Sequence, residues 1–304
     1  MTDLMQQKIN TITNSSKEQI LAKVFASIDL PKEKDSRYKF TLLDNLIDIQ
    51  RVADKFASDN PQVLAVDTET QGLKWSDKII GVSFSWSDND NYYIPFRHEC
   101  DDHQMDVEDC RDILNDMFGS ESTKYVFHNF KFDYHKLRMD GIHIGGEAHD
   151  TMLMHYVIDE NESHSLKNLA ARFVDEKAHE YEKLIADIRR KLARSLKIKM
   201  KDFGFEHIPI DIMVEYACRD TLYTLKLFDV LLRKIVEDPR IYDVYTRELD
   251  LLPVLCSMEE GGVYVDQSIL VEKSSALGEQ LDVLKAEVWD LADIEFDLNS
   301  PPQI

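Results

Sequence analysis

The sequence predicts an α/β protein in which a sheet of mixed direction is flanked by helices and followed by a mainly helical C-terminal extension. Three observations predict this class. Short apolar runs rich in β-branched residues alternate with helical periodicity as far as residue 139. From residue 150 onward the periodicity is almost entirely helical. The 304 residues are 43% hydrophobic, which is enough to build a buried core.

The first half of the chain is expected to form the sheet. It follows a polar leader, residues 1–40, in which 17–27 has helical character. Strands are expected at 63–70, 79–86, 92–96 and 124–128, and the turn-prone residues 87–91 make the second and third of these a hairpin. Helices are expected at 42–56, 107–118 and 130–139, the first docked on the sheet by its apolar face.

The second half is expected to be helical. Ser165 is an expected N-cap, and a short strand is expected at 263–265. The expected helices span residues 149–157, 165–173, 180–200, 212–235, 247–260 and 267–291. The chain thus divides into the polar leader, a main domain at 41–238 and a helical extension at 239–304.

Charge and cysteine content exclude several classes of protein. The net charge of −21 argues against binding nucleic acid by bulk electrostatics, although an enzyme could still take a few nucleotides into a metal-filled cleft. One basic stretch, residues 183–201, could serve such a cleft, and a solvated helix face is the alternative. The four scattered cysteines predict free thiols in a reducing compartment. No apolar run approaches the length of a membrane span.

Two carboxylates end the most apolar expected strand. Residues i and i+2 of a strand point to the same side, so Asp67 and Glu69 should lie together at the end of 63–70. Adjacent buried negative charges are costly unless a cation neutralises them. Hard oxygen ligands favour Mg²⁺ or Mn²⁺ over Zn²⁺. The alternative is a strand that runs out into an acidic surface loop.

Two further acidic residues accompany this pair. Asp133 lies in the first turns of the helix that follows Asn129, where a plain capping role, with Asn129 as the N-cap, is the alternative. Tyr216 and Asp220 are four residues apart on a helix and share a face. The alternative for Asp220 is an ion pair with Arg219 or a nearby lysine.

Taken in order, the motifs Asp67-x-Glu69, Asn129-x-x-x-Asp133 and Tyr216-x-x-x-Asp220 resemble the proofreading 3′–5′ exonuclease domain of the DNA polymerase I family (family A). This is the DEDD branch that has a tyrosine in its third motif. Four further segments resemble the same family: residues 149–153, 165–170, 252–266 and 296–304. Of these, 252–266 is similar to the join into the polymerase part and 296–304 to the start of its thumb region. The resemblance implies a ribonuclease H-like fold.

The resemblance also implies a mechanism. Two divalent cations, Mg²⁺ or Mn²⁺, would lie about 3.5–4 Å apart and be held by the four acidic residues. Tyr216 and Glu69 would orient the attacking water, and nucleoside 5′-monophosphates would be released from DNA 3′ ends. The expected substrate-binding residues are Thr68, Leu73, Asn129, Arg189, Arg190 and Arg194.

The implied substrate is single-stranded DNA or a frayed 3′ end. The chain would be the proofreading part of a split or truncated polymerase, with a separate polymerase chain as partner and no polymerase activity of its own. Its expected location is the cytoplasm of a bacterium, or of the host if a phage encodes it. Two alternatives stay open, an RNA 3′–5′ exonuclease of ribonuclease D type and a module that docks a separate polymerase chain.

Overall fold

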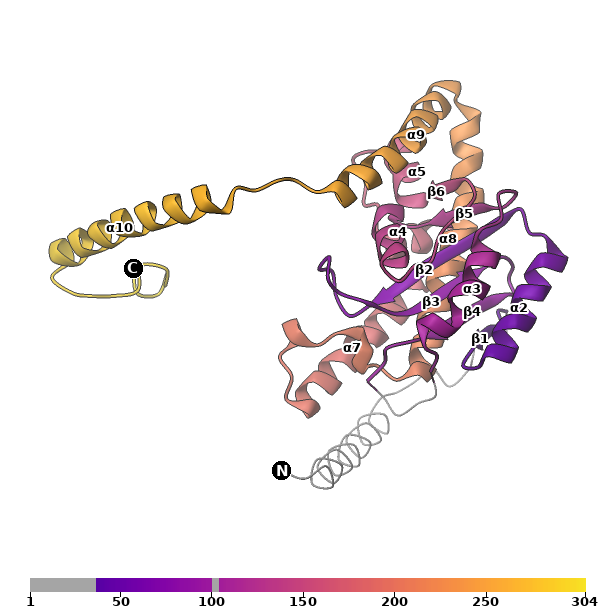
Figure 1. The fold of residues 1–304 in the computed structure, drawn as a ribbon, viewed down its shortest axis with the longest axis horizontal. Coiled ribbons are helices and arrows are strands. Elements are labelled where there is room, and N and C mark those ends of the chain that lie inside the picture. The colour runs from indigo at the N-terminus through magenta and orange to yellow at the C-terminus, as the bar shows by residue number, and fades with distance from the viewer. Residues whose placement is uncertain (1–36, 100–103) are drawn as a thin grey trace. The chain divides into compact units, whose positions relative to one another are not determined.

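The computed structural model describes residues 37–99 and 104–304 (Figure 1). In this part of the chain six strands form one sheet with the order β1-β4-β3-β2-β5-β6. β2, β3 and β4 pair antiparallel, whereas the remaining pairs are parallel, so the predicted mixed sheet is confirmed. The strands are β1 (Phe40–Leu42), β2 (Val63–Thr70), β3 (Ile79–Ser85), β4 (Asn91–Pro95), β5 (Lys124–Phe127) and β6 (Ala148–Asp150).

Helices cover both faces of this sheet, as predicted. On one face, α2 (Leu46–Asp59), α3 (Val107–Phe118) and α4 (Phe130–Met139) enclose a core with sheet residues that include Leu64 and Val66. The other face is crossed by α8 (Ile210–Glu237), which contacts β2, β3 and β4. Beside α8 pack α5 (Thr151–Ile158), α6 (Leu166–Phe173) and α7 (Ala178–Leu196), and two 3₁₀ turns, η1 (Met200–Asp202) and η2 (Phe205–His207), lead from α7 to α8.

The register of β2 decides where its two acidic residues point. Asp67 pairs with Ser83 of β3. Two residues further along β3, the hydroxyl of Ser85 lies 2.7 Å from the hydroxyl of Thr221 in α8. Because alternate residues of a strand share a face, Asp67 and Glu69 face α8, whereas Thr68 faces the opposite side.

Several expected elements differ from the structure at their ends. Two three-residue edge strands were missed, β1 in the segment assigned to the leader and the first helix, and β6 in the segment assigned to a helix start. The first helix begins at Leu46 because the side chain of Asn45 accepts the amide of Asp48 at 2.9 Å. The predicted strand at 263–265 is wrong, since those residues have no regular structure. The predicted helix at 17–27 lies outside the described residues.

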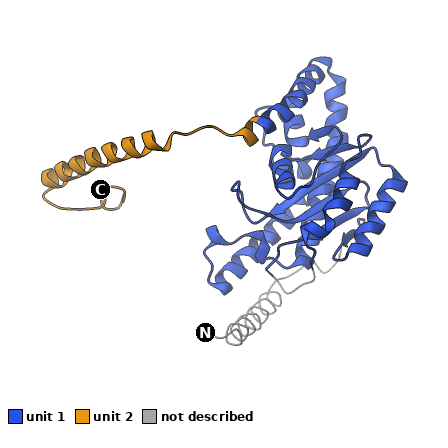
Figure 2. Ribbon diagram, viewed as in Figure 1, with its two compact units in different colours: residues 1–257 blue, residues 258–304 orange. Residues whose placement is uncertain are grey.

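The last part of the chain forms a separate unit. Contacts divide the chain into Met1–Ser257 and Met258–Ile304 (Figure 2), and α9 (Pro239–Gly261) crosses that division. α9 begins at Pro239, where a helix break was expected, because proline is tolerated in a first turn. α10 (Gln267–Ala292) has no buried residue. No helix in residues 37–99 or 104–304 is long and apolar enough to cross a membrane.

Candidate active site

Three of the four expected metal ligands converge beside the sheet. Asp67 and Glu69 on β2 and Asp220 on α8 each offer an oxygen, and these oxygens all lie within 4.8 Å of one another. The pairing register described above explains this, since it turns both β2 carboxylates toward α8. The convergence of Asp67 and Glu69 follows from the period of a strand, whereas that of Asp220 depends on how α8 crosses the sheet.

The fourth expected ligand, Asp133, is attached to the same strand from the α4 side. Its Oδ1 accepts the Thr68 amide at 3.0 Å and the Thr68 hydroxyl at 2.5 Å. These two hydrogen bonds join Asp133 to β2 and not to the N-terminus of its own helix. Burial, together with the charge of Asp67, raises the pKa of Asp133 well above its usual range.

Asp150, at the end of β6, holds the N-terminus of α4. The expectation that the Asn129 side chain caps this helix is wrong, since Asn129 is left-handed with φ of 80° and makes no side-chain cap bond. The Asp150 carboxylate instead accepts the amides of Asn129 and Phe130, each at 3.0 Å. The same carboxylate also accepts the amides of Met152 and Leu153 at the start of α5. One side chain therefore caps two helices.

Lys167 of α6 is the partner of Asp220. Its ammonium contacts Asp220 Oδ1 and lies 4.6 Å from the centre of the Tyr216 ring. Of the two alternatives weighed for Asp220, a nearby lysine is the one observed, because Arg219 pairs with Glu215 at 2.8 Å. A helix carrying Lys167 was expected, but its role beside the acidic cluster was not.

The electrostatics of this cluster fit a divalent cation. Burial raises the pKa of Asp67 to about 7 and that of Glu69 to about 8, the charge of Asp67 adding to the second shift. Burial also lowers the pKa of Lys167 to about 8. The Oε1 atom of Glu69 is buried without a hydrogen-bond partner. A set of oxygen donors with excess negative charge and one unpaired oxygen is what a hard divalent cation requires.

Tyr216 lies beside these carboxylates, one helical turn before Asp220. Burial and the nearby charges of Glu69 and Asp67 raise the pKa of its phenol. Its ring stacks on Phe205 with the two centres 5.8 Å apart. The guanidinium of Arg189 lies 4.6 Å from the Phe205 ring centre.

The arginines expected to bind substrate differ in their surroundings. Arg189 donates to the carbonyl of Phe203 at 2.9 Å and supports the segment that carries Phe205. Arg190 and Arg194 are exposed on α7, and Arg190 lies 3.6 Å from Asp187. Their exposure leaves Arg190 and Arg194 accessible to a phosphate backbone.

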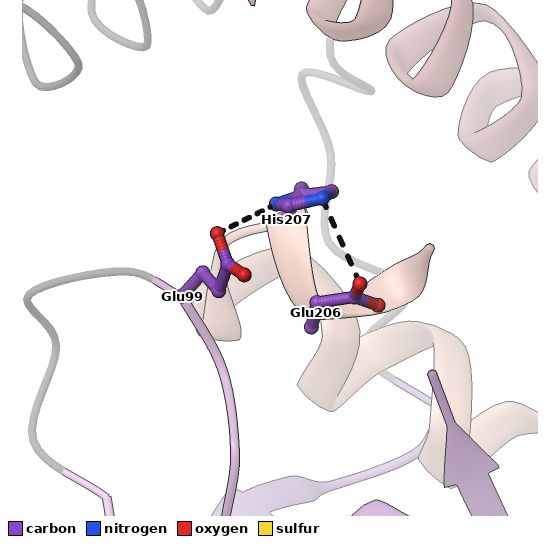
Figure 3. Close-up of side chains that lie close together, drawn as sticks. All are labelled: Glu99, Glu206 and His207. Carbon is purple, nitrogen blue, oxygen red and sulfur yellow. Dashed lines mark ion pairs between the residues drawn. The ribbon is translucent and has the colours of Figure 1, made fainter. Parts of the chain in front are cut away.

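A second group of acidic and histidine side chains lies at the end of η2 (Figure 3). His207 is between two carboxylates, with Nδ1 3.2 Å from Glu99 and Nε2 3.6 Å from Glu206. The Glu99 amide also donates to the carbonyl of Glu206 at 2.8 Å. Sequence reasoning did not find this group, since its members come from distant segments. These contacts join the segment after β4 to η2, which begins with Phe205.

The loop between β2 and β3 carries Leu73, whose side chain is 88% exposed. The loop itself is fixed in place by Lys136 of α4, whose ammonium donates to the carbonyls of Lys74, Trp75 and Asp77 at 2.6, 3.1 and 2.8 Å. Leu73 is therefore an exposed residue on a well-held loop and not part of the core.

Comparison with known proteins agrees with this geometry. A family model described as 3′–5′ exonuclease, that of family A DNA polymerases, matches residues 43–236. The chain belongs to this exonuclease family. DNA polymerase I of Borreliella burgdorferi is 29% identical over 86% of the exonuclease chain, and the DNA polymerase of Escherichia phage T5 is 31% identical over 76%. The matched part is 26% of the first relative and 27% of the second, so the chain spans about a quarter of their length.

A solved structure supports the fold of this exonuclease. The POL domain of Pol1 from M. smegmatis, in complex with DNA primer-template and dNTP, superposes with a TM-score of 0.57 at 16% sequence identity. The superposition covers 83% of this chain and 38% of that one. The family implies divalent metal ions, which the cluster of Asp67, Glu69 and Asp220 is suited to hold.

Proposed function

We propose that this chain removes nucleotides one at a time from DNA 3′ ends, releasing nucleoside 5′-monophosphates, as the proofreading part of a family A DNA polymerase. The observation that carries the proposal is the convergence of Asp67, Glu69 and Asp220 within 4.8 Å. Bound Mg²⁺ or Mn²⁺ would activate water near neutral pH and stabilise the leaving oxygen of a phosphodiester. The expected substrate is a single strand or a frayed 3′ end, in the cytoplasm of a bacterium or of a phage host.

The side chains would divide the work as follows. Asp67, Glu69 and Asp220 would hold one cation, and Asp133 would contribute to a second. The Tyr216 phenol, protonated because burial raises its pKa, would donate a hydrogen bond that orients the attacking water together with Glu69.

The strand end would be held by residues around this cluster. Exposed Leu73 would contact the terminal base, and Asn129 would contact the strand beside it. Arg190 and Arg194 would approach the phosphates, whereas Arg189 would act by supporting Phe205. The Thr68 hydroxyl is bonded to Asp133, so we assign Thr68 to positioning that carboxylate.

Substitution of the acidic cluster tests the proposal. Asp67→Ala and Asp220→Ala should each lower nucleotide release from a 5′-labelled single-stranded DNA by about a hundredfold or more in Mn²⁺, since the cation would lose a ligand. Asp211→Ala is the matched control, because Asp211 is exposed in the first turn of the same helix. EDTA should stop the reaction and Mn²⁺ or Mg²⁺ should restore it. Retention of more than a few per cent of activity in either cluster variant would contradict the assignment.

A direct comparison of nucleic acids separates DNA proofreading from RNA trimming. Matched DNA and RNA oligonucleotides of one sequence should be degraded at different rates, with DNA faster, because discrimination depends on contacts to the 2′-hydroxyl. Faster degradation of RNA would favour the ribonuclease D-type alternative and remove the proofreading assignment.

A second function, docking of a separate polymerase chain, is favoured by α10. Its exposed apolar residues include Leu270, Leu277, Leu281 and Leu284, whose spacing places them on one side of the helix. Exposed apolar stripes of this kind are typical of protein–protein contacts. The matching relatives are polymerases that extend well beyond the matched region, so a polymerase chain of this family is the partner we propose.

Size-exclusion chromatography tests docking. The wild-type chain should elute together with the polymerase part of a family A enzyme, and Leu281→Asp should abolish the joint peak without changing nuclease activity on single strands. Ser275→Asp, on the side of α10 away from these four leucines, is the control. Separate elution of the wild-type chain and the polymerase would contradict this second function.

A further inference from the structure

Lys167 places a positive charge inside the acidic cluster. Its side chain is 11% exposed, as is that of Asp220, whose Oδ1 it contacts. The ammonium lies 4.6 Å from the ring centre of Tyr216 and 6.0 Å from that of Tyr223. Glu69 and Asp67 attract it as well. Two aromatic rings and three carboxylates therefore surround one flexible, singly charged group.

This position conflicts with that of a metal ligand. Asp220 is one of the three residues whose oxygens come within 4.8 Å of one another, and Lys167 covers an oxygen of that same carboxylate. A divalent cation that used this oxygen would meet the ammonium at close range, and like charges repel strongly in a buried setting. The Lys167 ammonium and a divalent cation therefore cannot share this oxygen of Asp220.

We propose that Lys167 is a built-in counterion of the metal-free site, which stabilises the carboxylate cluster and must leave Asp220 when a divalent cation binds. This inference rests on the proposed function in so far as the cluster binds a metal. It assigns Lys167 as a positioning residue that sets metal affinity. Lysine suits this role because its four-carbon stem can swing the charge away while α6 stays in place.

Metal binding measured without substrate tests the inference. Full-length EDTA-treated protein is titrated with Mn²⁺ by calorimetry, and its melting temperature is recorded with and without Mn²⁺. Lys167→Met should bind Mn²⁺ about tenfold more tightly than wild type, since no ammonium has to be displaced. Without metal its melting temperature should fall by roughly 5–10 °C, because the buried carboxylates lose their counterion. Mn²⁺ should then raise the melting temperature more than it does in wild type.

Two further variants separate this role from a purely structural one. Lys226→Met is the matched control, because Lys226 is on α8 and pairs with Asp88 at 2.7 Å outside the acidic cluster. It should leave Mn²⁺ affinity unchanged. Lys167→Gln keeps most of the side-chain volume and can donate a hydrogen bond to Asp220, so it should fold even where the methionine variant does not, with the same gain in affinity. Lys167→Arg keeps the charge and should show no gain.

Equal or weaker Mn²⁺ binding by the methionine and glutamine variants, relative to wild type, would overturn the inference. This outcome differs from failure of the proposed function. If wild type binds Mn²⁺, Asp220→Asn weakens that binding and the Lys167 variants match wild type, the metal site stands and only the counterion role is lost. If neither wild type nor any Lys167 variant binds Mn²⁺, both are lost.

Discussion

Asp150 offers a sharp test of how the fold supports the candidate site. Its buried carboxylate accepts two amides at the start of α4, from Asn129 and Phe130, at 3.0 Å each. It accepts two more at the start of α5, from Met152 and Leu153, at 2.9 and 3.3 Å. Asp150→Ala would leave these N–H groups without an acceptor. Because α4 carries Asp133, the substitution should also loosen one side of the acidic cluster.

The cost of this substitution can be worked out from those contacts. Loss of an N-cap costs about 1 kcal/mol and up to about 2 kcal/mol, and a hydrogen bond to a charged group contributes about 1.5–3 kcal/mol. Counted as one hydrogen bond to a charged group for each helix, two caps on one carboxylate give about 3–6 kcal/mol. Burial raises the pKa of Asp150 in spite of its four donors, so removing the charge recovers part of the desolvation cost. We expect a loss near the lower end, about 3 kcal/mol, which corresponds to roughly 6–12 °C in melting temperature.

Urea unfolding followed by far-UV circular dichroism measures this loss. Asp106→Ala is the matched control, since Asp106 caps α3 through the Glu108 amide at 3.1 Å on the exposed surface and should cost only about 0.5–1 kcal/mol. Asp150→Asn keeps one acceptor oxygen, so its loss of unfolding free energy should lie between the losses of Asp150→Ala and Asp106→Ala. If Asp150→Ala is no more destabilising than Asp106→Ala, the double-cap reasoning is refuted.

Three other outcomes are expected. Thr68→Val removes the 2.5 Å hydrogen bond from the Thr68 hydroxyl to Asp133 and should lower kcat/KM on single-stranded DNA about tenfold or more. Thr68→Ser keeps the hydroxyl and should stay near wild type. Equal activity of the two variants would contradict the positioning role of Thr68. The second outcome concerns pH and is measured in EDTA. The raised pKa of Glu69, about 8, means that between about pH 5 and pH 7 the folded state holds a proton that the unfolded chain has released. As pH rises through this range, the unfolding free energy of wild type should therefore fall relative to that of Glu69→Gln. Burial lowers the pKa of His128 and His149 to about 4, which makes stability rise with pH, but both proteins carry these histidines and their effect cancels in the difference. If the unfolding free energy of wild type stays constant or grows relative to that of Glu69→Gln across this range, the pKa shift of Glu69 is contradicted. Leu73→Ala should raise KM severalfold and leave the melting temperature unchanged, and a marked drop in that temperature would mean that the side chain packs in the protein.

The central elements were predictable because each has a strong local signal. β2 has four apolar residues followed by alternating acids, and its predicted bounds, Val63–Thr70, agree with the structure. The edge strands β1 and β6 could not be found in this way. Each has three residues, too few to show a period, and each exists because it pairs with another strand of the sheet.

The acidic cluster was predictable to a different degree. The period of a strand alone places Asp67 beside Glu69. Asp220 joins them only because α8 crosses the sheet at that point. The order of the motifs indicated this, whereas no local sequence pattern could. In the sequence, Lys167 is recognisable only as part of a segment, residues 165–170, that resembles the family. Its contact with Asp220 depends on the packing of α6 against α8, and no residue near Lys167 in the sequence signals that contact.

The three hydrogen bonds from the Lys136 ammonium to carbonyls of the loop that carries Leu73 hold this loop rigidly against α4. The same helix carries Asp133, so the distance from the exposed leucine to the acidic cluster is set by the scaffold and does not depend on a bound strand. Such a loop does not close like a lid. In the proposed function it would act as a fixed stop for the strand end, and the length of chain removed in each cycle would then be set by the protein's own dimensions, the same for every terminal base.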